Sequence, residues 1–380
     1  MRILADENIP KLGEYFSPYA QIKRKAGRLI TAEDVKNVDA LLVRSVTAVN
    51  AQLLEGSSVR FVGTCTIGTD HLDIDYLNAQ QIAWSNAPGC NARGVVDYIL
   101  SSLSVLAERT GTGWPDKTFG IVGVGQVGGR LAQVLKNLGL KVLLCDPPRA
   151  RCEGWADYVS LPQIIEHCDV ICLHTPLTKI GKDATWHLLN GKNLLQLKPN
   201  AWLLNASRGP VIDNQALAEL VQKRSDIRLV LDVWEHEPLV DMALLAYADI
   251  ATPHIAGYSL DGKIRGTEQI CHAFARHFAL PMPEQSFYPK QSVERLVLSD
   301  EASFPADFYR FIRLVYDVRT DDSAMRLALR ANTTESAMAQ AFDALRKNYP
   351  IRREIPDLKI DLLPSVLRTQ LQALGIVFSS

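Results

Sequence analysis

The chain has 380 residues, which is more than one compact core usually holds and predicts two or three domains. Its apolar fraction of 47% and charged fraction of 22% are typical of globular proteins and exclude collagen, coiled-coil arrays and long-range disorder. The formal net charge is −1, from 41 Lys and Arg against 42 Asp and Glu. Nothing in that balance indicates nucleic acid or an anionic membrane as a partner.

The N-terminus MRILADENIP lacks the long apolar run of a signal peptide, and no stretch of about 18 uncharged apolar residues predicts a membrane span. A cytoplasmic protein with reduced cysteines is expected. Cys168 and Cys172 lie near two histidines, but CDVICLHTP reads as a buried strand, whose side chains point alternately to opposite faces. We therefore expect no metal site.

Short apolar runs alternate with helical stretches over the first ninety residues. Strands are predicted at 2–5, 39–44, 59–63 and 82–85, and helices near 10–17, 48–55 and 73–81. This alternation favours a parallel α/β sheet. A long helix with a broad apolar face follows from Ala92 to Arg109 and ends at Thr110-Gly111.

A second α/β series begins with the strand TFGIV, a glycine-rich turn, an amphipathic helix and the strand KVLLC. Further strands are predicted at 169–174, 201–206, 227–233 and 249–254. Two such series predict two Rossmann-like or flavodoxin-like parallel sheets with a cleft between them, where a ligand would bind.

The last hundred residues have a different texture and predict a small C-terminal α+β domain. LPMPEQSFYP reads as a linker, and helices are predicted at 304–318, 333–349 and 364–375, with Thr333 or Thr334 as N-cap of the second and Gly375 ending the third. AMRLALRA (324–331) alternates like a half-buried strand. Aromatic residues crowd into the first helix, which favours a homodimer interface, although the tail could instead pack on its own chain.

The glycine-rich turn has the spacing Gly123-x-Gly125-x-x-Gly128 between a strand and a helix. The first glycine suits the tight turn, the second lets the backbone approach a pyrophosphate, and the third lets the helix pack on the strand. Asp146 ends the next strand, where its carboxylate can accept hydrogen bonds from the adenosine ribose. The motif therefore predicts a dinucleotide site.

Asp146 also favours NAD over NADP, because a carboxylate repels the 2′-phosphate. Arg149 and Arg151 are the opposing signal, since arginine can receive that phosphate, unless both are solvated loop charges.

Three polar groups follow apolar strands further along the chain. NASRGP carries Arg208, LDVWEHEP carries Asp232 and Glu237, and ATPHIAGYS carries His254. An arginine, a carboxylate and a histidine at neighbouring strand ends can assist the oxidation of an alcohol beside a carboxylate, as hydride leaves the carbon for a bound dinucleotide. The histidine takes the hydroxyl proton, the carboxylate fixes its tautomer, and the arginine holds the substrate carboxylate and polarises the forming carbonyl. Each residue alone could be structural.

Five motifs in order carry a resemblance to a known family: GVGQVG with Asp146, LHTPLT (173–178), NASRGPVID (205–213), DVWEHEP (232–238) and TPHIAGYS (252–259). Over roughly residues 1–280 the chain resembles the NAD-dependent D-isomer-specific 2-hydroxyacid dehydrogenases. The resemblance implies that Arg208, Glu237 and His254 are catalytic. It places His174 in the wall of the site and His236 in a turn. The implied cofactor residues are Gly123, Gly125, Gln126, Val127, Gly128, Asp146, Thr175, Ala206, Asp232 and Gly257.

The family's organisation implies a substrate-binding domain of residues 1–95 with 255–280, an NAD-binding domain of 96–254, and the tail from 281 to 380 as a dimerisation domain. VRSVT (43–47) and CTIGTDHLD (65–73) resemble loops that meet the substrate. Ser45 and Thr66 are the candidates for contacts to substrate oxygens, with turn capping as the alternative.

Tyr258 and the tail resemble a family member whose substrate is a small phosphorylated 2-hydroxy acid, and Arg44 is a candidate for its phosphate. An enzyme acting on phosphoglycerate or another D-2-hydroxy acid, with an unrelated tail, is the alternative. An NAD-sensing, corepressor-like binding protein is the alternative from another class, which the presence of Arg208, Glu237 and His254 disfavours.

Overall fold

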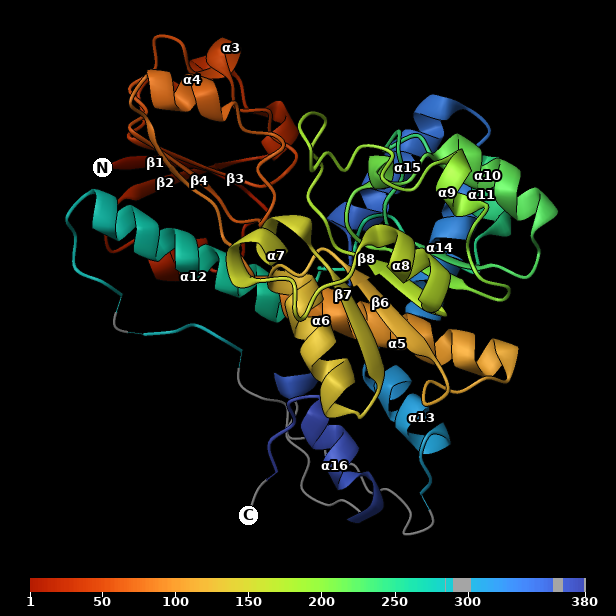
Figure 1. Cartoon of the computed structure of the whole chain (residues 1–380). Helices are drawn as coiled ribbons and strands as arrows, with labels where there is room; N and C mark the ends of the chain where they lie inside the picture. Colours follow the sequence, from red (N-terminus) through yellow and green to blue (C-terminus); the bar gives the residue numbers. More distant parts are fainter. Residues whose placement is uncertain (284, 290–301, 358–364, 379–380) are drawn as a thin grey trace. The chain divides into compact units, whose positions relative to one another are not determined.

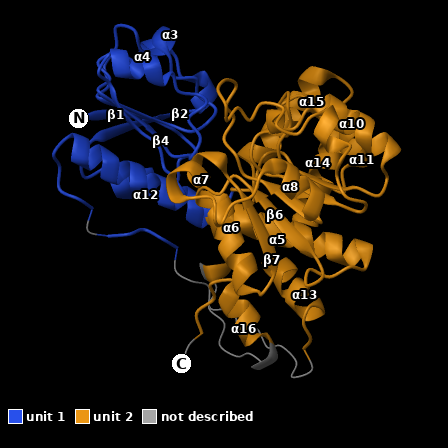
Figure 2. Ribbon diagram, viewed as in Figure 1, with its two compact units in different colours: residues 1–92, 258–290 blue, residues 93–257, 291–380 orange. Residues whose placement is uncertain are grey.

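The computed structural model describes residues 1–283, 285–289, 302–357 and 365–378 (Figure 1). The chain divides into two compact units, each assembled from two separate parts of the sequence (Figure 2). Unit 1 comprises Met1–Ala92 and Tyr258–Lys290, and unit 2 comprises Arg93–Gly257 and Gln291–Ser380. The tail thus groups with the glycine-rich unit, and its separation as a third domain stays a prediction.

Unit 1 is a five-stranded, fully parallel sheet in the order β2-β1-β3-β4-β5. Its strands are β1 (Arg2–Asp6), β2 (Gln21–Lys25), β3 (Ala40–Val43), β4 (Phe61–Thr64) and β5 (Ala83–Ser85). Its helices are α1 (Leu12–Phe16), α2 (Ala32–Val35), α3 (Ala51–Leu54), α4 (Ile74–Ala79) and α12 (Leu260–His277). The predicted helices near 10–17, 48–55 and 73–81 are confirmed.

The two faces of this sheet bury two separate cores, because successive strand residues point to opposite sides. Ile3 and Leu42 face the core that includes Phe274 of α12, whereas Leu4 and Leu41 face the other core. Strand β2 was not predicted from the sequence. QIKRK forms an edge strand whose residues are exposed or half-buried, so it carries no apolar pattern.

Unit 2 contains a six-stranded parallel sheet in the order β11-β10-β9-β8-β6-β7. The strands are β6 (Thr118–Val122), β7 (Lys141–Cys145), β8 (Val170–Leu173), β9 (Trp202–Asn205), β10 (Arg228–Leu231) and β11 (Ile250–Ala251). The helices between them are α6 (Gln126–Asn137), α7 (Pro147–Glu153), α8 (Leu161–His167), α9 (Gly191–Leu194), α10 (Asn214–Lys223) and α11 (Met242–Tyr247), and the predicted long helix is α5 (Ala92–Thr110). The predicted strands of this series are all confirmed.

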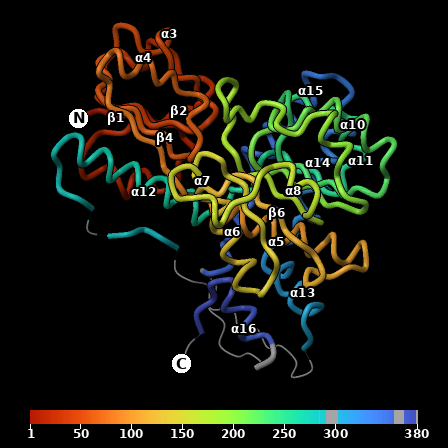
Figure 3. Tube along the Cα trace, viewed as in Figure 1, coloured from red at the N-terminus to blue at the C-terminus, as the bar shows by residue number. Residues whose placement is uncertain are grey.

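The described tail residues form helices: α13 (Ala306–Val315), α14 (Val318–Arg330), α15 (Glu335–Lys347) and α16 (Ser365–Ala373) (Figure 3). Thr334 caps α15, and Gly375 follows α16 with a φ of +86°. Glu284 of the predicted linker and Pro364 of the third predicted helix lie outside the described residues. None of the helices that the structure describes is long and apolar enough to cross a lipid bilayer.

The strand predicted at 324–331 is wrong, because these residues form the second half of helix α14 and its C-cap, Ala331. Val318, Asp322, Met325 and Leu329 are buried at helical spacing, while Leu327 of the supposed apolar stripe is 70% exposed. Met325 and Leu329 join the core of the unit 2 sheet. Asp322 accepts the backbone N–H of Ala251, at 2.8 Å, on the edge strand β11. The helix therefore protects the open edge of the sheet.

The aromatic residues that favoured a dimer interface are mostly buried within the single chain. Phe308, Tyr309, Phe311 and Tyr316 have at most 8% of their surface exposed. Phe308 and Tyr309 pack on Trp114, and the hydroxyl of Tyr309 accepts the backbone N–H of Trp114 at 2.8 Å. These side chains therefore pack the tail on its own unit, as the alternative to a homodimer interface predicts.

Candidate active site

The functional candidates of unit 2 follow one row of paired residues across the sheet. Pairing aligns Val122 with Leu173, Leu173 with Asn205, Asn205 with Leu231, and Leu231 with Ala251. Each strand is parallel, so the residue after each row member lies at the same carboxyl edge. Gly123, His174, Ala206, Asp232 and Thr252 occupy these positions. The site predicted at this edge is thus assembled by register.

The glycine-rich turn lies at the point where the strand order reverses, between β6 and its neighbours β7 and β8. Gly123 has a φ of +86°, and a Cβ there would lie 2.7 Å from the carbonyl of His174. A Cβ on Gly128 would lie 2.0 Å from the carbonyl oxygen of Gly123, whereas Gly125 faces open space. The close packing at Gly123 and Gly128, and the room beside Gly125, fit a phosphate-binding turn.

Asp146 follows β7 and holds the turn in place. Its carboxylate accepts the backbone N–H of Val124 at 2.8 Å and that of Arg149 at 3.1 Å. Arg149 is paired through two nitrogens with Glu153, at 2.7 and 3.0 Å, and Arg151 is hydrogen-bonded to Asp183. Both arginines thus already carry carboxylate partners, which weakens the signal for NADP.

Unsatisfied polar atoms remain beside the same turn. Both ring nitrogens of His174 and the hydroxyl of Thr175 are buried and have no hydrogen-bond partner among the described residues. Burial lowers the pKa of His174 to about 4, so the ring is neutral near pH 7. Buried polar groups are normally hydrogen-bonded. A bound dinucleotide would supply such partners, so these residues fit NAD. The sequence predicted His174 only as part of the wall of the site, whereas its two ring nitrogens can also hydrogen-bond to a ligand.

Asp232 organises the loop that carries His254. Its backbone carbonyl accepts the N–H of His254 at 2.7 Å, and its carboxylate accepts the N–H groups of Ile255 and Ala256 at 2.8 and 2.9 Å. The hydroxyl of Thr252 donates to the same carboxylate at 2.7 Å. Burial raises the pKa of Asp232, and these hydrogen bonds oppose that effect. Asp232 is therefore part of the framework of the loop.

Glu237 and His254 meet as the sequence predicts. Oε2 of Glu237 lies 2.8 Å from Nδ1 of His254, and its Oε1 accepts the backbone N–H of Trp234 at 2.8 Å. Burial alone raises the pKa of Glu237, but His254, the N–H of Trp234 and the charge of Arg346 hold it below its usual value. His254 itself has a φ of +57°, which is uncommon for a residue other than glycine. The carboxylate fixes one ring nitrogen and leaves Nε2 for chemistry.

Arg208 lies in the loop after β9, beside the loop of Glu237. The next residue, Gly209, packs so closely that a Cβ would lie 2.0 Å from the backbone of Trp234. Asn205 accepts from Ser207 and donates to the carbonyl of Arg208 at 3.0 Å. Nη1 of Arg208 donates to the carbonyl of Ser207 at 2.8 Å. The arginine is thus held by a rigid turn against the loop that positions Glu237.

The substrate candidates lie in unit 1. Nε of Arg44 is 3.3 Å from Oδ2 of the fully buried Asp6. Ser45 is exposed, whereas the hydroxyl of Thr66 lies 2.8 Å from that of Thr64 and 3.3 Å from the carbonyl of Gly68, which is turn capping. Lys263 lies 4.6 Å above the ring of Tyr258.

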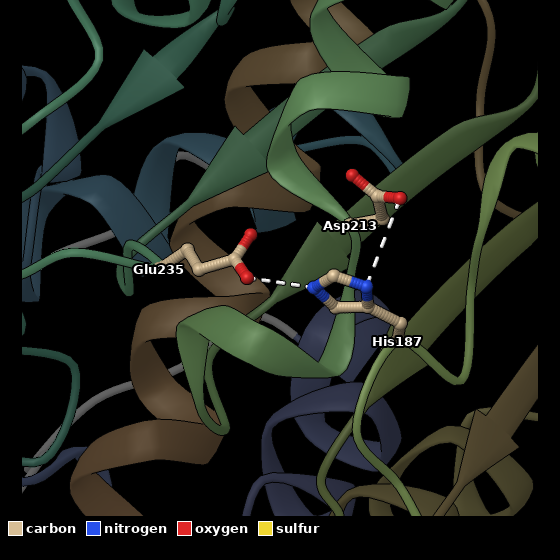
Figure 4. A group of neighbouring side chains, drawn as sticks. All are labelled: His187, Asp213 and Glu235. Carbon is tan, nitrogen blue, oxygen red and sulfur yellow. Dashed lines mark hydrogen bonds and ion pairs between the residues drawn. The ribbon is translucent and has the colours of Figure 1, made fainter.

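One cluster was not recognised in the sequence (Figure 4). His187 lies between two carboxylates, with Nε2 2.6 Å from Glu235 and Nδ1 3.7 Å from Asp213. Its parts lie 22 to 48 residues apart in the sequence, so no local pattern connects them. Among the described residues these three are a candidate group for a metal ion. However, the two carboxylates face different nitrogens of one ring, and only Glu235 lies within hydrogen-bond distance of it, so the geometry favours a structural contact between loops.

Comparison with known proteins gives matches over both parts of the chain. Residues 103–256 match the family "D-isomer specific 2-hydroxyacid dehydrogenase, NAD binding domain", and residues 287–375 match "Domain of unknown function (DUF3410)". The erythronate-4-phosphate dehydrogenase of Pseudomonas fluorescens Pf0-1 is 53% identical, covering 99% of this chain and 100% of the relative. The chain belongs to the erythronate-4-phosphate dehydrogenase family. This family is the one that Tyr258 and the tail indicated.

A second relative agrees with this assignment, and solved structures share the fold. The erythronate-4-phosphate dehydrogenase of Pseudomonas putida W619 is 54% identical over 95% of both chains. NAD⁺-bound 3-phosphoglycerate dehydrogenase of Entamoeba histolytica has a TM-score of 0.64 at 23% identity, over 76% of this chain and 99% of that structure. D-lactate dehydrogenase of Aquifex aeolicus, complexed with NAD and lactic acid, has a TM-score of 0.61 at 23% identity, over 73% and 96%. The predicted parallel-sheet α/β fold, the family and the NAD cofactor are confirmed.

Proposed function

We propose that the chain oxidises 4-phospho-D-erythronate to 2-oxo-3-hydroxy-4-phosphobutanoate with NAD, a step of pyridoxal 5′-phosphate biosynthesis. The observation that carries the proposal is the contact of 2.8 Å between Glu237 and Nδ1 of His254, at the same carboxyl edge of the sheet as the dinucleotide turn. The near full-length similarity to named erythronate-4-phosphate dehydrogenases supports the choice of substrate.

Bound NAD would supply the hydride acceptor for the oxidation at C2 of the substrate. Nε2 of His254 takes the proton of the C2 hydroxyl as the carbonyl forms, and Glu237 stabilises the resulting imidazolium. Arg208 binds the substrate carboxylate and polarises the forming carbonyl through its planar guanidinium. Both electrons of the C–H bond leave with the hydride, so no other oxidant is required.

The dinucleotide is held by the residues of the glycine-rich turn and its surroundings. We assign Gly123, Gly125, Gln126, Val127 and Gly128 to the pyrophosphate. Asp146 would accept the ribose hydroxyls, and Thr175, Ala206, Asp232 and Gly257 would line the rest of the site. The neutral His174 and the unsatisfied hydroxyl of Thr175 support this placement.

Ser45, Thr66 and Tyr258 are proposed to contact substrate oxygens, and Arg44 the phosphate. Only Nε of Arg44 is used by Asp6 among the described contacts, so the outer nitrogens of the guanidinium can bind an anion. Lys263, over the ring of Tyr258, adds positive charge in the same unit.

We also propose a cytoplasmic homodimer. Soluble oligomers are most often twofold-symmetric homodimers. Leu314 and Leu327 of the tail, which are 66% and 70% exposed, are the apolar side chains that we assign to such an interface. Six of the seven cysteines are buried as free thiols, which fits a reducing compartment.

The test is NADH formation by the purified chain, followed by absorbance, with a panel of D-2-hydroxy acids with and without a terminal phosphate. Turnover of 4-phospho-D-erythronate well above 3-phosphoglycerate and D-lactate is expected. Preference for another acid would contradict the substrate, and no turnover of any acid despite NAD binding would favour a binding protein.

A further inference from the structure

Asp232 holds several backbone N–H groups of the loop that carries His254. The N–H groups of Ile255 and Ala256 donate to the Asp232 carboxylate. These contacts do not involve the backbone carbonyl of Ala256. The carbonyl of Ala256 points to Arg352 of the tail, whose Nη2 donates to it. The same Nη2 also donates to the carbonyl of Gly94, at 3.3 Å, in the first turn of α5.

Arg352 is a buried cation in a built environment. Only 6% of its surface is exposed, and its guanidinium lies 4.3 Å from the ring centroid of Tyr316 and 5.8 Å from that of Tyr349. Its Nη1 donates to the hydroxyl of Tyr349 at 3.3 Å. Two aromatic faces and a phenol oxygen thus fix the plane of the guanidinium.

The aromatic residues are themselves fixed by one carboxylate. The hydroxyls of Tyr316 and Tyr349 donate to Oδ2 of Asp321, at 2.6 and 2.8 Å, and Asp321 is 9% exposed. The main chain beyond Arg352 is anchored separately, since the N–H of Ile355 donates to Asp97 of α5 at 2.9 Å. The segment that carries Arg352 is therefore anchored on both sides of this residue, by Tyr349 at Asp321 and by Ile355 at Asp97.

We propose that Arg352 is a positioning residue for the reaction. It acts through the Ala256 carbonyl, and it sets the orientation of the loop between His254 and Gly257. Nε of this guanidinium is buried without a partner among the described residues, so its hydrogen bonds are made by Nη1 and Nη2. Since losing one of these bonds would leave another buried donor unsatisfied, the bond from Nη2 favours one position of the Ala256 carbonyl. The acid/base role of His254 is part of the proposed function, so the role of Arg352 rests on that function as well.

The tail would then position the loop that carries His254, in addition to any role in forming a homodimer. His254 sits at a positive φ, a conformation that persists only where its surroundings determine it. Asp232 supplies one set of contacts to the loop and Arg352 the other. Loss of the second set should leave the chain able to bind NAD but with His254 misplaced.

The test compares Arg352→Lys and Arg352→Met in the full chain, with Arg330→Met as the matched control. Arg330 is an exposed arginine at the end of α14 in the same tail. Lysine keeps the charge and can reach one carbonyl, which makes this variant the safer one for folding.

Hydrogen exchange of the peptide covering 252–257 is the first measurement. In both Arg352 variants it should be roughly tenfold faster than in the wild type, with exchange in the β6–β8 strands unchanged. Arg330→Met should match the wild type. Unchanged exchange in a folded Arg352→Met or Arg352→Lys protein would overturn the inference.

Kinetics on 4-phospho-D-erythronate is the second measurement. A fall in kcat of about 10- to 100-fold is expected for Arg352→Met, with a smaller fall for Arg352→Lys, little change in KM for NAD, and a larger isotope effect with 2-deuterated substrate. A rise in KM for NAD with unchanged kcat would contradict a positioning role. If the wild type itself does not oxidise this substrate, the proposed function fails, and the exchange experiment still decides whether Arg352 holds the loop.

Discussion

Glu237 and His254 are joined by a contact of 2.8 Å between Oε2 and Nδ1, although they belong to different loops at the ends of β10 and β11. Because Glu237 also accepts the N–H of Trp234, its carboxylate is fixed before any substrate binds. The pair leaves only Nε2 of the imidazole for proton transfer, which is the arrangement required for an acid/base histidine.

His254→Ala should lower turnover by ~10²–10⁴-fold, the usual loss on removing a general acid/base. NAD affinity, measured by calorimetry, should change little, since the glycine-rich turn and Asp146 remain. His236→Ala is the control, because His236 is an exposed histidine in the same region of unit 2. Near wild-type turnover in His254→Ala would remove His254 from the mechanism.

Arg208→Lys keeps the positive charge but loses the planar pair of donors. Hydrogen bonds to charged groups contribute about 1.5–3 kcal/mol, so kcat/KM for the hydroxy acid should fall by about 10- to 100-fold. Steady-state kinetics with saturating NAD would measure it. Arg228→Lys serves as control, since that arginine belongs to β10 and pairs with Asp249. Equal kinetics of Arg208→Lys and wild type would show that the carboxylate is bound elsewhere.

Asp146→Asn tests cofactor choice, and its amide oxygen can still accept a backbone N–H. Removing the charge should weaken NAD and raise the relative use of NADP by about tenfold or more, because like charges brought together cost several kcal/mol. The ratio of kcat/KM for the two cofactors is the measurement. An unchanged ratio would mean that another residue discriminates against the 2′-phosphate.

The buried His174 predicts how stability depends on pH. Its pKa is lowered from 6.5 to about 4 in the folded chain. Since the unfolded state binds the proton more readily, this stabilisation is complete above pH 6.5 and is lost as pH falls towards 4. The loss would reach about 3 kcal/mol at most, at 1.36 kcal/mol per unit of pKa.

His174→Gln should therefore show a smaller fall in the unfolding midpoint between these two pH values than the wild type does. Thermal or denaturant unfolding across the pH range would measure it. His236→Gln, which changes an exposed histidine, should follow the wild type. Parallel pH curves for His174→Gln and wild type would show that His174 is not buried as a neutral ring.

The proposed dimer is tested by charge substitution on the exposed apolar residues of the tail. Leu314→Glu and Leu327→Glu, made together, should give a monomer by light scattering at micromolar concentration, because a charge in an apolar interface is costly to desolvate. Leu29→Glu is the control, since Leu29 is 64% exposed and lies in unit 1. A double variant that stays dimeric would place the interface elsewhere.

The dinucleotide turn could be predicted from the sequence because its requirements are local. Gly123, Gly125 and Gly128 follow a strand and open a helix, and a Cβ on Gly128 would meet the carbonyl oxygen of Gly123 in the same turn. The buried strands were predicted for the same reason, since a parallel strand covered on both faces is a continuous apolar run. The predicted contact between Glu237 and His254 depended on knowing the family's motifs.

Tertiary structure decided the elements whose local pattern is ambiguous. Residues 324–331 alternate like a strand, yet they form a helix because Asp322, Met325 and Leu329 together cover the edge and core beside β11. QIKRK became strand β2 through pairing with β1, since an exposed edge strand needs no apolar pattern.

The contacts of Arg352 and His187 are likewise decided by tertiary structure alone. Arg352 meets the Ala256 carbonyl 96 residues away, and His187 meets Glu235 48 residues away. A charged side chain near a proline-containing turn looks solvated in sequence, and only the folded chain shows that it is buried. Local backbone preference and apolar periodicity depend on neighbouring residues, whereas the partner of a buried charge depends on how distant segments pack.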